Sequence, residues 1–163
     1  RYRIMMNTIL ETDRRFGVLM WDQAQGKPAT VGCCAEIAQF QRLPDDRMKI
    51  RTIGQQRFRV LEYVREKPYR VGLVEWIEDA PPSQNLQPLA DNVSQLLRDV
   101  VRLSAKLTDE EIELPDSIPE SPLELSYWVA SNLYGVAEEQ QALLEMQATA
   151  TRLEREAEIL TST

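Results

Sequence analysis

The spacing of the apolar residues changes across a proline-rich segment, residues 79–88 (DAPPSQNLQP). Before this segment, short apolar runs alternate with turn-forming residues, which is the pattern of antiparallel β-strands. After it, apolar residues recur every three or four positions, which is the pattern of amphipathic helices. The sequence therefore predicts an α+β fold with a β-rich subdomain at 1–79, a linker at 80–88 and a helical subdomain at 89–163.

The β-rich part begins with RYRIMMNTILETD, whose apolar spacing predicts a short amphipathic helix. Strand-like runs follow, separated by turn signals at residues 44–46 (PDD), 54–56 (GQQ) and 65–68 (REKP). We expect Gly54 to occupy the turn of a β-hairpin, because glycine adopts positive φ angles without strain. Together these signals predict an antiparallel meander.

Four cations flank the predicted Gly54 hairpin. Strand alternation places Lys49 and Arg51 on the face opposite their apolar neighbours, and it places Arg57 and Arg59 likewise across the turn. We therefore expect four basic side chains close together on one surface, as a candidate partner-binding face. Two sources of counter-charge stay open, the acidic second half of the chain or an acidic segment of a partner.

The second half contains three predicted helical stretches. The first carries a stripe of apolar residues spaced three and four apart, from Leu86 to Leu107. An acidic loop follows at residues 108–121, and Ser121 with Pro122 and Glu124 then gives a capping-box start for the second helix. The last stretch, residues 143–160, is predicted as one helix from its apolar spacing.

Charge is divided unevenly between the two halves. Residues 1–82 contain 14 Lys and Arg against 11 Asp and Glu, whereas residues 83–163 contain 5 against 15. The formal net charge of −7 disfavours nucleic acid as a partner, because phosphate binding depends on Lys and Arg. The uneven charge indicates either that the two halves face one another or that each faces a different partner.

The chain lacks the residues of the common catalytic sites. It has no histidine, which is the usual general base near neutral pH. Its six glycines form neither a phosphate-binding GxxxxGK[ST] loop nor a dinucleotide-binding GxGxxG motif, and no GxSxG element is present. We therefore predict a protein that is not an enzyme and has no cofactor, no metal site and no catalytic residues.

The two cysteines, Cys33 and Cys34, are adjacent, which disfavours an ordinary disulfide between them. We interpret them as small residues of a strand, in keeping with a reducing compartment. No apolar stretch approaches the length of about 20 residues that a membrane helix needs, and no signal-peptide pattern opens the chain. A cytoplasmic protein is expected, or one of the plastid stroma if an upstream transit segment has been removed.

The first 79 residues resemble the amino-terminal, substrate-binding domain family of Lon proteases. The runs RYRIMM, FGVLMW and PYRVGLVEWIED follow in the family's order, and GxxRFxV (Gly54, Arg57, Phe58 and Val60) is the most specific element. The helical half is similar through VASNL, EEQQALLE and the RL pair at Arg152. Residues 104–124 carry no such match.

This resemblance implies a bent antiparallel β pseudo-barrel of the PUA-like class, followed by a helical bundle. It implies a non-catalytic, free-standing module that binds polypeptide, as an adaptor in proteolysis, quality control or assembly. RNA binding by the barrel and small-molecule binding between barrel and helices are the alternatives. The family's proline-rich first strand is missing ahead of the RY helix, so we expect an open sheet edge, left by trimming or filled by another chain. The oligomeric state stays open.

Overall fold

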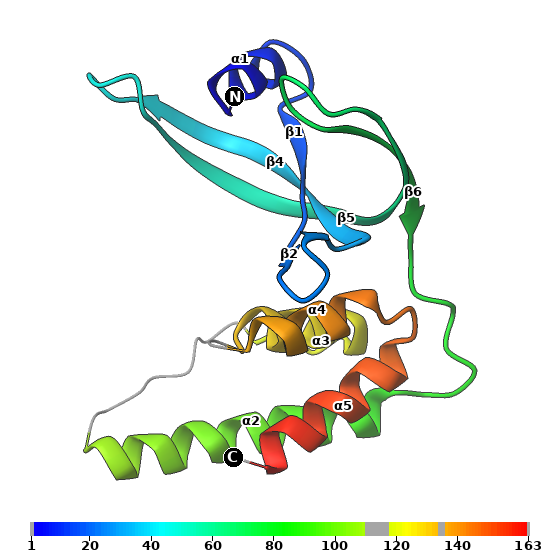
Figure 1. Cartoon of the computed structure of the whole chain (residues 1–163). Coiled ribbons are helices and arrows are strands. Elements are labelled where there is room, and N and C mark those ends of the chain that lie inside the picture. Colours follow the sequence, from blue (N-terminus) through cyan, green and yellow to red (C-terminus); the bar gives the residue numbers. More distant parts are fainter. Residues whose placement is uncertain (1, 110–117, 134–135, 163) are drawn as a thin grey trace. The chain divides into compact units, whose positions relative to one another are not determined.

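The computed structural model describes residues 2–109, 118–133 and 136–162 (Figure 1). The chain divides into two compact units, Arg1–Glu78 and Asp79–Thr163. We call them the β unit and the helical unit. Within the described residues, no helix has the length and apolar character required to cross a membrane.

The β unit contains one helix and an antiparallel sheet. Its elements are α1 (Tyr2–Leu10), β1 (Arg15–Val18), β2 (Trp21–Asp22), β3 (Lys27–Pro28), β4 (Val31–Arg42), β5 (Met48–Arg65) and β6 (Val71–Ile77). The four longer strands pair in the order β1-β4-β5-β6, and β2 pairs with β3 in a separate ladder. The predicted α+β class, the amino-terminal helix and the antiparallel pairing are confirmed.

The predicted hairpin turn at Gly54 is wrong. Gly54 lies inside the 18-residue strand β5, paired with Ala35. Cys33 pairs with Arg57, so Gln55 and Gln56 together lie opposite one residue of β4. The GQQ segment, predicted as a turn, therefore forms a β-bulge. A glycine inside a strand often marks such a bulge, because it tolerates the local bend. The turn between β4 and β5 occurs at the predicted PDD segment instead.

Two glycines make room for the buried ring of Phe58 in the β unit. A Cβ atom added to Gly17 would lie 2.7 Å from Cζ of Phe58. One added to Gly32 would lie 2.3 Å from the backbone oxygen of Val18. These distances are below van der Waals contact, so the close approach of β1, β4 and the Phe58 ring depends on glycine at both positions.

The helical unit contains α2 (Gln87–Thr108), α3 (Pro122–Ser131), α4 (Ala137–Glu145) and α5 (Thr149–Thr161). Its core is a cluster of apolar side chains from α2, α3 and α5: Ala90, Val93, Leu125, Val129, Leu153 and Leu160. The helices form because each buries one apolar stripe against the others.

Three predictions for the helical unit need correction. The predicted last helix is two helices, α4 and α5, separated by residues 146–148. The stripe of α2 is buried only in part, because Leu103 and Leu107 are exposed. The helix start at Ser121 is confirmed, but its side chain forms no capping hydrogen bond. Most of the predicted acidic loop, residues 110–117, lies outside the described residues.

Candidate functional site

The four cations predicted to share one surface are separated in the structure. Lys49 and Arg51 are exposed near the start of β5, opposite Gln41 and Gln39. Arg57 lies six residues further along the same strand, about 20 Å at a rise of about 3.3 Å per residue. Because β5 continues through Gly54 without a turn, the two pairs of cations lie apart along one strand and do not face each other across a hairpin.

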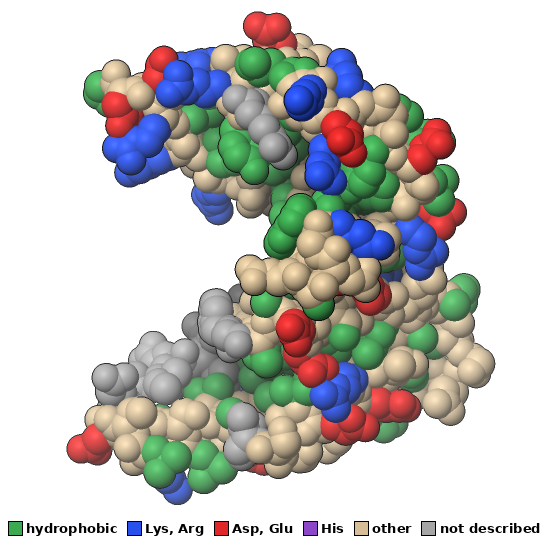
Figure 2. Space-filling model, in the orientation of Figure 1, with side chains coloured by type: hydrophobic (Ala, Val, Ile, Leu, Met, Phe, Trp, Pro, Cys, Tyr) green, Lys and Arg blue, Asp and Glu red, His purple; other side chains and the backbone are tan. Residues whose placement is uncertain are grey.

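Arg57 and Arg59 differ from the exposed pair in their surroundings. The Arg57 side chain is buried, with the residue only 5% exposed, so it contributes little to any surface. Arg59 donates a hydrogen bond to Glu75 on the neighbouring strand β6, with 3.1 Å between Nη1 and Oε1. The counter-charge for Arg59 therefore comes from within the β unit. Figure 2 shows basic and acidic side chains interspersed over the visible face of this unit.

Several large apolar side chains on the strands of the β unit are exposed. The exposed large residues of its strands are Val18, Trp21, Phe40, Ile50, Ile53, Leu61, Val64, Leu73 and Trp76. Phe40 and Ile50 are direct cross-strand partners, and the Trp76 ring packs edge-on against Phe58 with 6.4 Å between ring centroids. Phe40 and Ile50 therefore form an exposed apolar pair across β4 and β5.

Leu61 and Val64 belong to bulges of β5. The pairing with β6 shifts between Val60 and Glu62 and again between Tyr63 and Arg65, so each of these two apolar residues lies at an irregularity of the ladder. Bulges redirect side chains relative to a regular strand. Leu73, the partner of Glu62, lies between them on β6 and is also exposed.

The two cysteines are free and lie in β4. Burial raises the pKa of both thiols, Cys33 and Cys34, which disfavours the reactive thiolate. Their interpretation as residues of a strand is confirmed. Among the residues that the structure describes, no group of His, Cys, Asp and Glu side chains could hold a metal ion.

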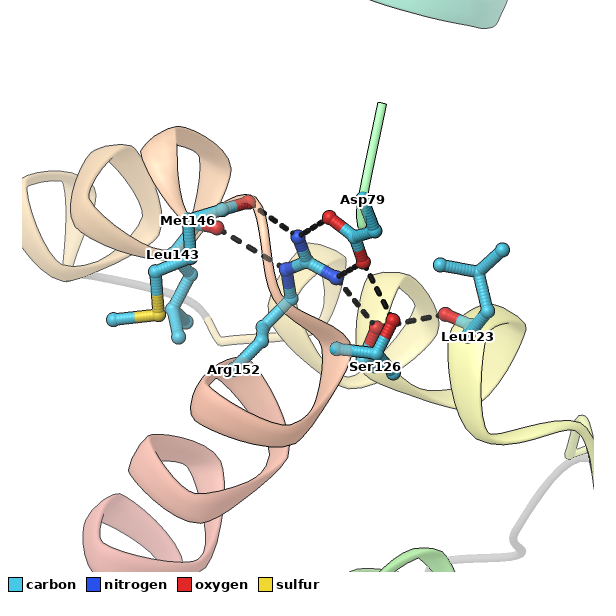
Figure 3. A network of polar contacts seen from close by, with 7 residues as sticks. Asp79, Leu123, Ser126, Leu143, Met146 and Arg152 are labelled. Carbon is cyan, nitrogen blue, oxygen red and sulfur yellow. Dashed lines mark hydrogen bonds and ion pairs between the residues drawn. The ribbon is translucent and has the colours of Figure 1, made fainter. Parts of the chain in front are cut away.

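The helical unit contains a buried polar network centred on Arg152 (Figure 3). The Arg152 side chain is fully buried and forms a bidentate ion pair with Asp79, at 2.7 and 2.8 Å. Its remaining N–H groups donate to the hydroxyl of Ser126 and to the backbone oxygens of Leu143 and Met146. All five N–H groups of the guanidinium are thus satisfied.

Other contacts complete this network. The Thr149 hydroxyl donates to Asp79 over 2.6 Å, and the Ser126 hydroxyl donates to the oxygen of Leu123 over 2.7 Å. The guanidinium carbon of Arg152 lies 4.4 Å from the centroid of the Tyr127 ring. Burial is the largest single effect and disfavours the charge of Arg152. The hydrogen bonding to Asp79, together with electrostatic attraction to Tyr127, Asp79 and Glu156, outweighs burial and raises the pKa of Arg152. The Arg152 guanidinium therefore links α5 to Asp79, to α3 and to the end of α4.

Glu156 lies one turn after Arg152 on α5 and is fully buried. Among the described residues, neither of its carboxyl oxygens has a hydrogen-bond partner. Burial raises the pKa of Glu156 to about 8, and the nearby Arg152 guanidinium offsets this rise only in part. The carboxyl group is therefore largely protonated at neutral pH.

Comparison with known families accounts for this arrangement of a β unit and a helical unit. The model of the family described as the ATP-dependent protease La (LON) substrate-binding domain matches residues 1–162. The chain belongs to the Lon substrate-binding domain family.

Solved Lon domains share this fold. The Lon N-terminal domain protein from Xanthomonas campestris superimposes with a TM-score of 0.67 at 23% identity, covering 95% of this chain and 81% of that one. The N-terminal domain of Mycobacterium avium complex Lon protease gives a TM-score of 0.68 at 15% identity, covering 96% and 82%. At these identities the likeness concerns the fold alone.

Curated relatives of this Lon-type domain are much longer proteins. Lon protease 2 of Myxococcus xanthus is 33% identical over 133 residues, which is 80% of this chain and 16% of that protein. Lon protease of Anaeromyxobacter dehalogenans is 32% identical over the same length and the same shares. The chain thus spans about a sixth of the length of these relatives.

Sequence reasoning on this Lon-type domain missed the network around Arg152. The sequence pattern places Asp79 at the end of the β-rich subdomain, and Arg152 stands out only within the family resemblance. Arg152 is not a member of the apolar stripe of the last helix, so the spacing gives no signal for its burial. Its partner, 73 residues earlier in the chain, gives no local signal.

Proposed function

We propose that this Lon-type domain is a non-catalytic polypeptide-binding module that acts as an adaptor in proteolysis or protein quality control. The observation that carries the proposal is the set of exposed apolar side chains on the strands of the β unit. Several of these residues are neighbours, such as Phe40 with Ile50, and exposed apolar residues that lie together, unlike single ones, mark interaction sites. The description of the matching family as a substrate-binding domain agrees with this assignment.

The proposal is tested by the binding of an unfolded polypeptide. Fluorescently labelled α-lactalbumin, reduced and alkylated so that it stays unfolded, is titrated with the domain and followed by anisotropy. The double variant Leu61→Ser/Leu73→Ser is expected to weaken binding by about tenfold or more, because a fully buried leucine contributes about 1.5–3 kcal/mol. Both side chains are more than half exposed, so the fold should persist.

A matched control is Leu123→Ser, which removes an exposed leucine from α3 in the helical unit. This variant should bind the unfolded polypeptide as the parent does. Equal affinities for the parent and the double variant would show that the exposed apolar residues of the strands are not the binding surface. Absence of binding by the parent would reject the polypeptide-binding function itself.

The non-catalytic part of the proposal has its own test. The purified domain should hydrolyse no ATP and cleave no casein above the buffer control, since the sequence contains no phosphate-binding loop and no histidine. Turnover that disappears on substitution of a residue in this chain would contradict it.

A further inference from the structure

The β4–β5 hairpin presents a polar face made of two strands. Gln41 pairs with Lys49, and Gln39 pairs with Arg51. Cross-strand partners project to the same side of a sheet, as do alternate residues of one strand, so these four side chains share one face. All four are exposed. We call this set the arm face.

The opposite side of the hairpin has a different character. Phe40 and Ile50 are the cross-strand pair that lies between the two pairs of the arm face, and they project to the other side. That other side also carries Arg42, the partner of Met48, which donates a hydrogen bond to Asn7. The arm face itself has two cations and two amides.

The carboxylates near the arm face already have cationic or amide partners. At the turn, Asp45 pairs with Arg47, and Asp46 pairs with Arg3 over 3.3 Å. Beyond the pair of Ile37 and Thr52 lies Glu36, which accepts a hydrogen bond from Gln55 over 3.0 Å and lies 3.9 Å from Arg15.

Lys49 and Arg51 are different. Among the residues that the structure describes, neither forms a salt bridge. The arm face thus has two positive charges that the described part of the β unit does not balance.

We propose that the arm face binds an acidic, extended segment of a partner polypeptide. Lys49 and Arg51 would pair with its carboxylates, and the amides of Gln39 and Gln41 would hydrogen-bond to its polar groups. Alternate side chains on an extended strand repeat every 6.6 Å or so, both on β5 and on a bound strand-like peptide. Acidic residues at alternate positions therefore match the spacing of the two cations. This inference rests on the polypeptide-binding function proposed above.

The charge of the chain favours a polypeptide over a nucleic acid at this face. Two cations would neutralise about two phosphates, which gives weak binding to a polyanion. The net charge of −7 repels a nucleic acid at long range. A short acidic segment carries few charges, so the net charge of the chain repels it less, and its attraction to Lys49 and Arg51 acts at short range.

The test uses three fluorescent probes at low ionic strength: a short peptide of alternating glutamate and valine, its counterpart with glutamine in place of glutamate, and a single-stranded RNA of equal charge. The acidic peptide is expected to bind more tightly than the other two, and its affinity should fall as salt is added. The variant Lys49→Glu/Arg51→Glu should reduce that affinity by about tenfold or more, because it replaces two attractions by two repulsions.

The control variant Arg98→Glu/Lys106→Glu makes the same change in net charge at exposed positions of α2. It should retain most of the peptide affinity, which separates local pairing from the overall charge. An equal loss in both variants would overturn the proposal, as would tighter binding of the RNA or of the glutamine peptide. If the acidic peptide fails to bind while unfolded α-lactalbumin binds, the arm face is rejected and the polypeptide-binding function stands.

Discussion

Asp79 and Arg152 lie 73 residues apart in the chain and form a buried, bidentate ion pair, with 2.7 Å between Nη2 and Oδ1. Asp79 is the first residue of the helical unit, and Arg152 belongs to its last helix. The ion pair therefore connects the first residue of the helical unit to its last helix, α5. Arg152 also caps the last turn of α4 through the backbone oxygens of Leu143 and Met146.

Removing one partner of this pair should destabilise the helical unit strongly. Asp79→Asn is expected to lower the free energy of unfolding by about 3–5 kcal/mol, because it leaves the Arg152 charge buried without its counter-charge. Urea denaturation followed by circular dichroism measures this change. The comparison is Arg102→Gln, which breaks an exposed pair with Asp99 and should cost less than about 1 kcal/mol. Similar losses in both variants would show that the buried pair has no special role.

Glycine should be required at position 32 and dispensable at position 54. Gly32→Ala places a methyl group against the backbone oxygen of Val18, which cannot move aside as a side chain can. We expect a loss of about 1–3 kcal/mol or more in the free energy of unfolding. Gly54→Ala meets only the Cys33 sulfur at 3.7 Å, an ordinary contact, and should unfold much as the parent does. A strongly destabilised Gly54→Ala would mean that the bulge of β5 needs glycine for its backbone conformation.

The stability of the helical unit should fall as the pH rises because of Glu156. Its pKa in the folded state is about 8, above the value of about 4.3 for an unfolded glutamate. Between these two values the unfolded chain has lost the proton and the folded chain keeps it, so unfolding becomes progressively easier. The contribution is complete below about pH 4.3 and is lost as the pH approaches 8.

Glu156→Gln keeps the shape of the side chain and removes the titration. Melting temperatures of the parent and this variant, measured from pH 5 to pH 8 (the window set by the two pKa values), should diverge as the pH rises, with the variant gaining relative to the parent. Charges on α2 and α3 lie at exposed or half-exposed positions, and Arg152 is the charged group that acts on Glu156. Parallel curves for the two proteins would show that Glu156 ionises normally in the folded state.

The apolar stripe of α2 should contribute to stability along only part of its length. Leu107 is 88% exposed, so Leu107→Ala should change the free energy of unfolding by less than about 0.5 kcal/mol. Leu153 on α5 is fully buried in the core, and Leu153→Ala should cost about 2–5 kcal/mol. A large loss for Leu107→Ala, measured by urea denaturation at several protein concentrations, would indicate that a second chain covers this end of α2.

Local patterns predicted most of the elements. The apolar spacing located α1 and α2, and Ser121 with Pro122 located the start of α3, because these signals depend on residues within one or two helical turns. Strand-like runs and the PDD turn signal located β4 and β5 for the same reason. The resemblance carried by the strand-like runs and the GxxRFxV segment predicted the family, and the match over residues 1–162 confirms it.

The predictions that the structure corrects failed because they depend on contacts between residues far apart in the chain. Gly54 has the local environment of a turn, but its position is set by pairing with Ala35 on another strand. The break between α4 and α5 cannot be read from the apolar spacing, which continues through it. Arg152 satisfies the carboxyl end of α4 across that break, and its own burial depends on Asp79.

The sequence by itself determined the fold class, the two kinds of structure on either side of residues 79–88, and the family. Only the tertiary structure decided which cations share a surface. Strand alternation assigned Lys49, Arg51, Arg57 and Arg59 to one face, yet β5 runs on without turning back, and burial removes Arg57 from the surface. Periodicity fixes the side to which a residue projects, whereas its neighbours depend on strand register, and register is set by the whole sheet.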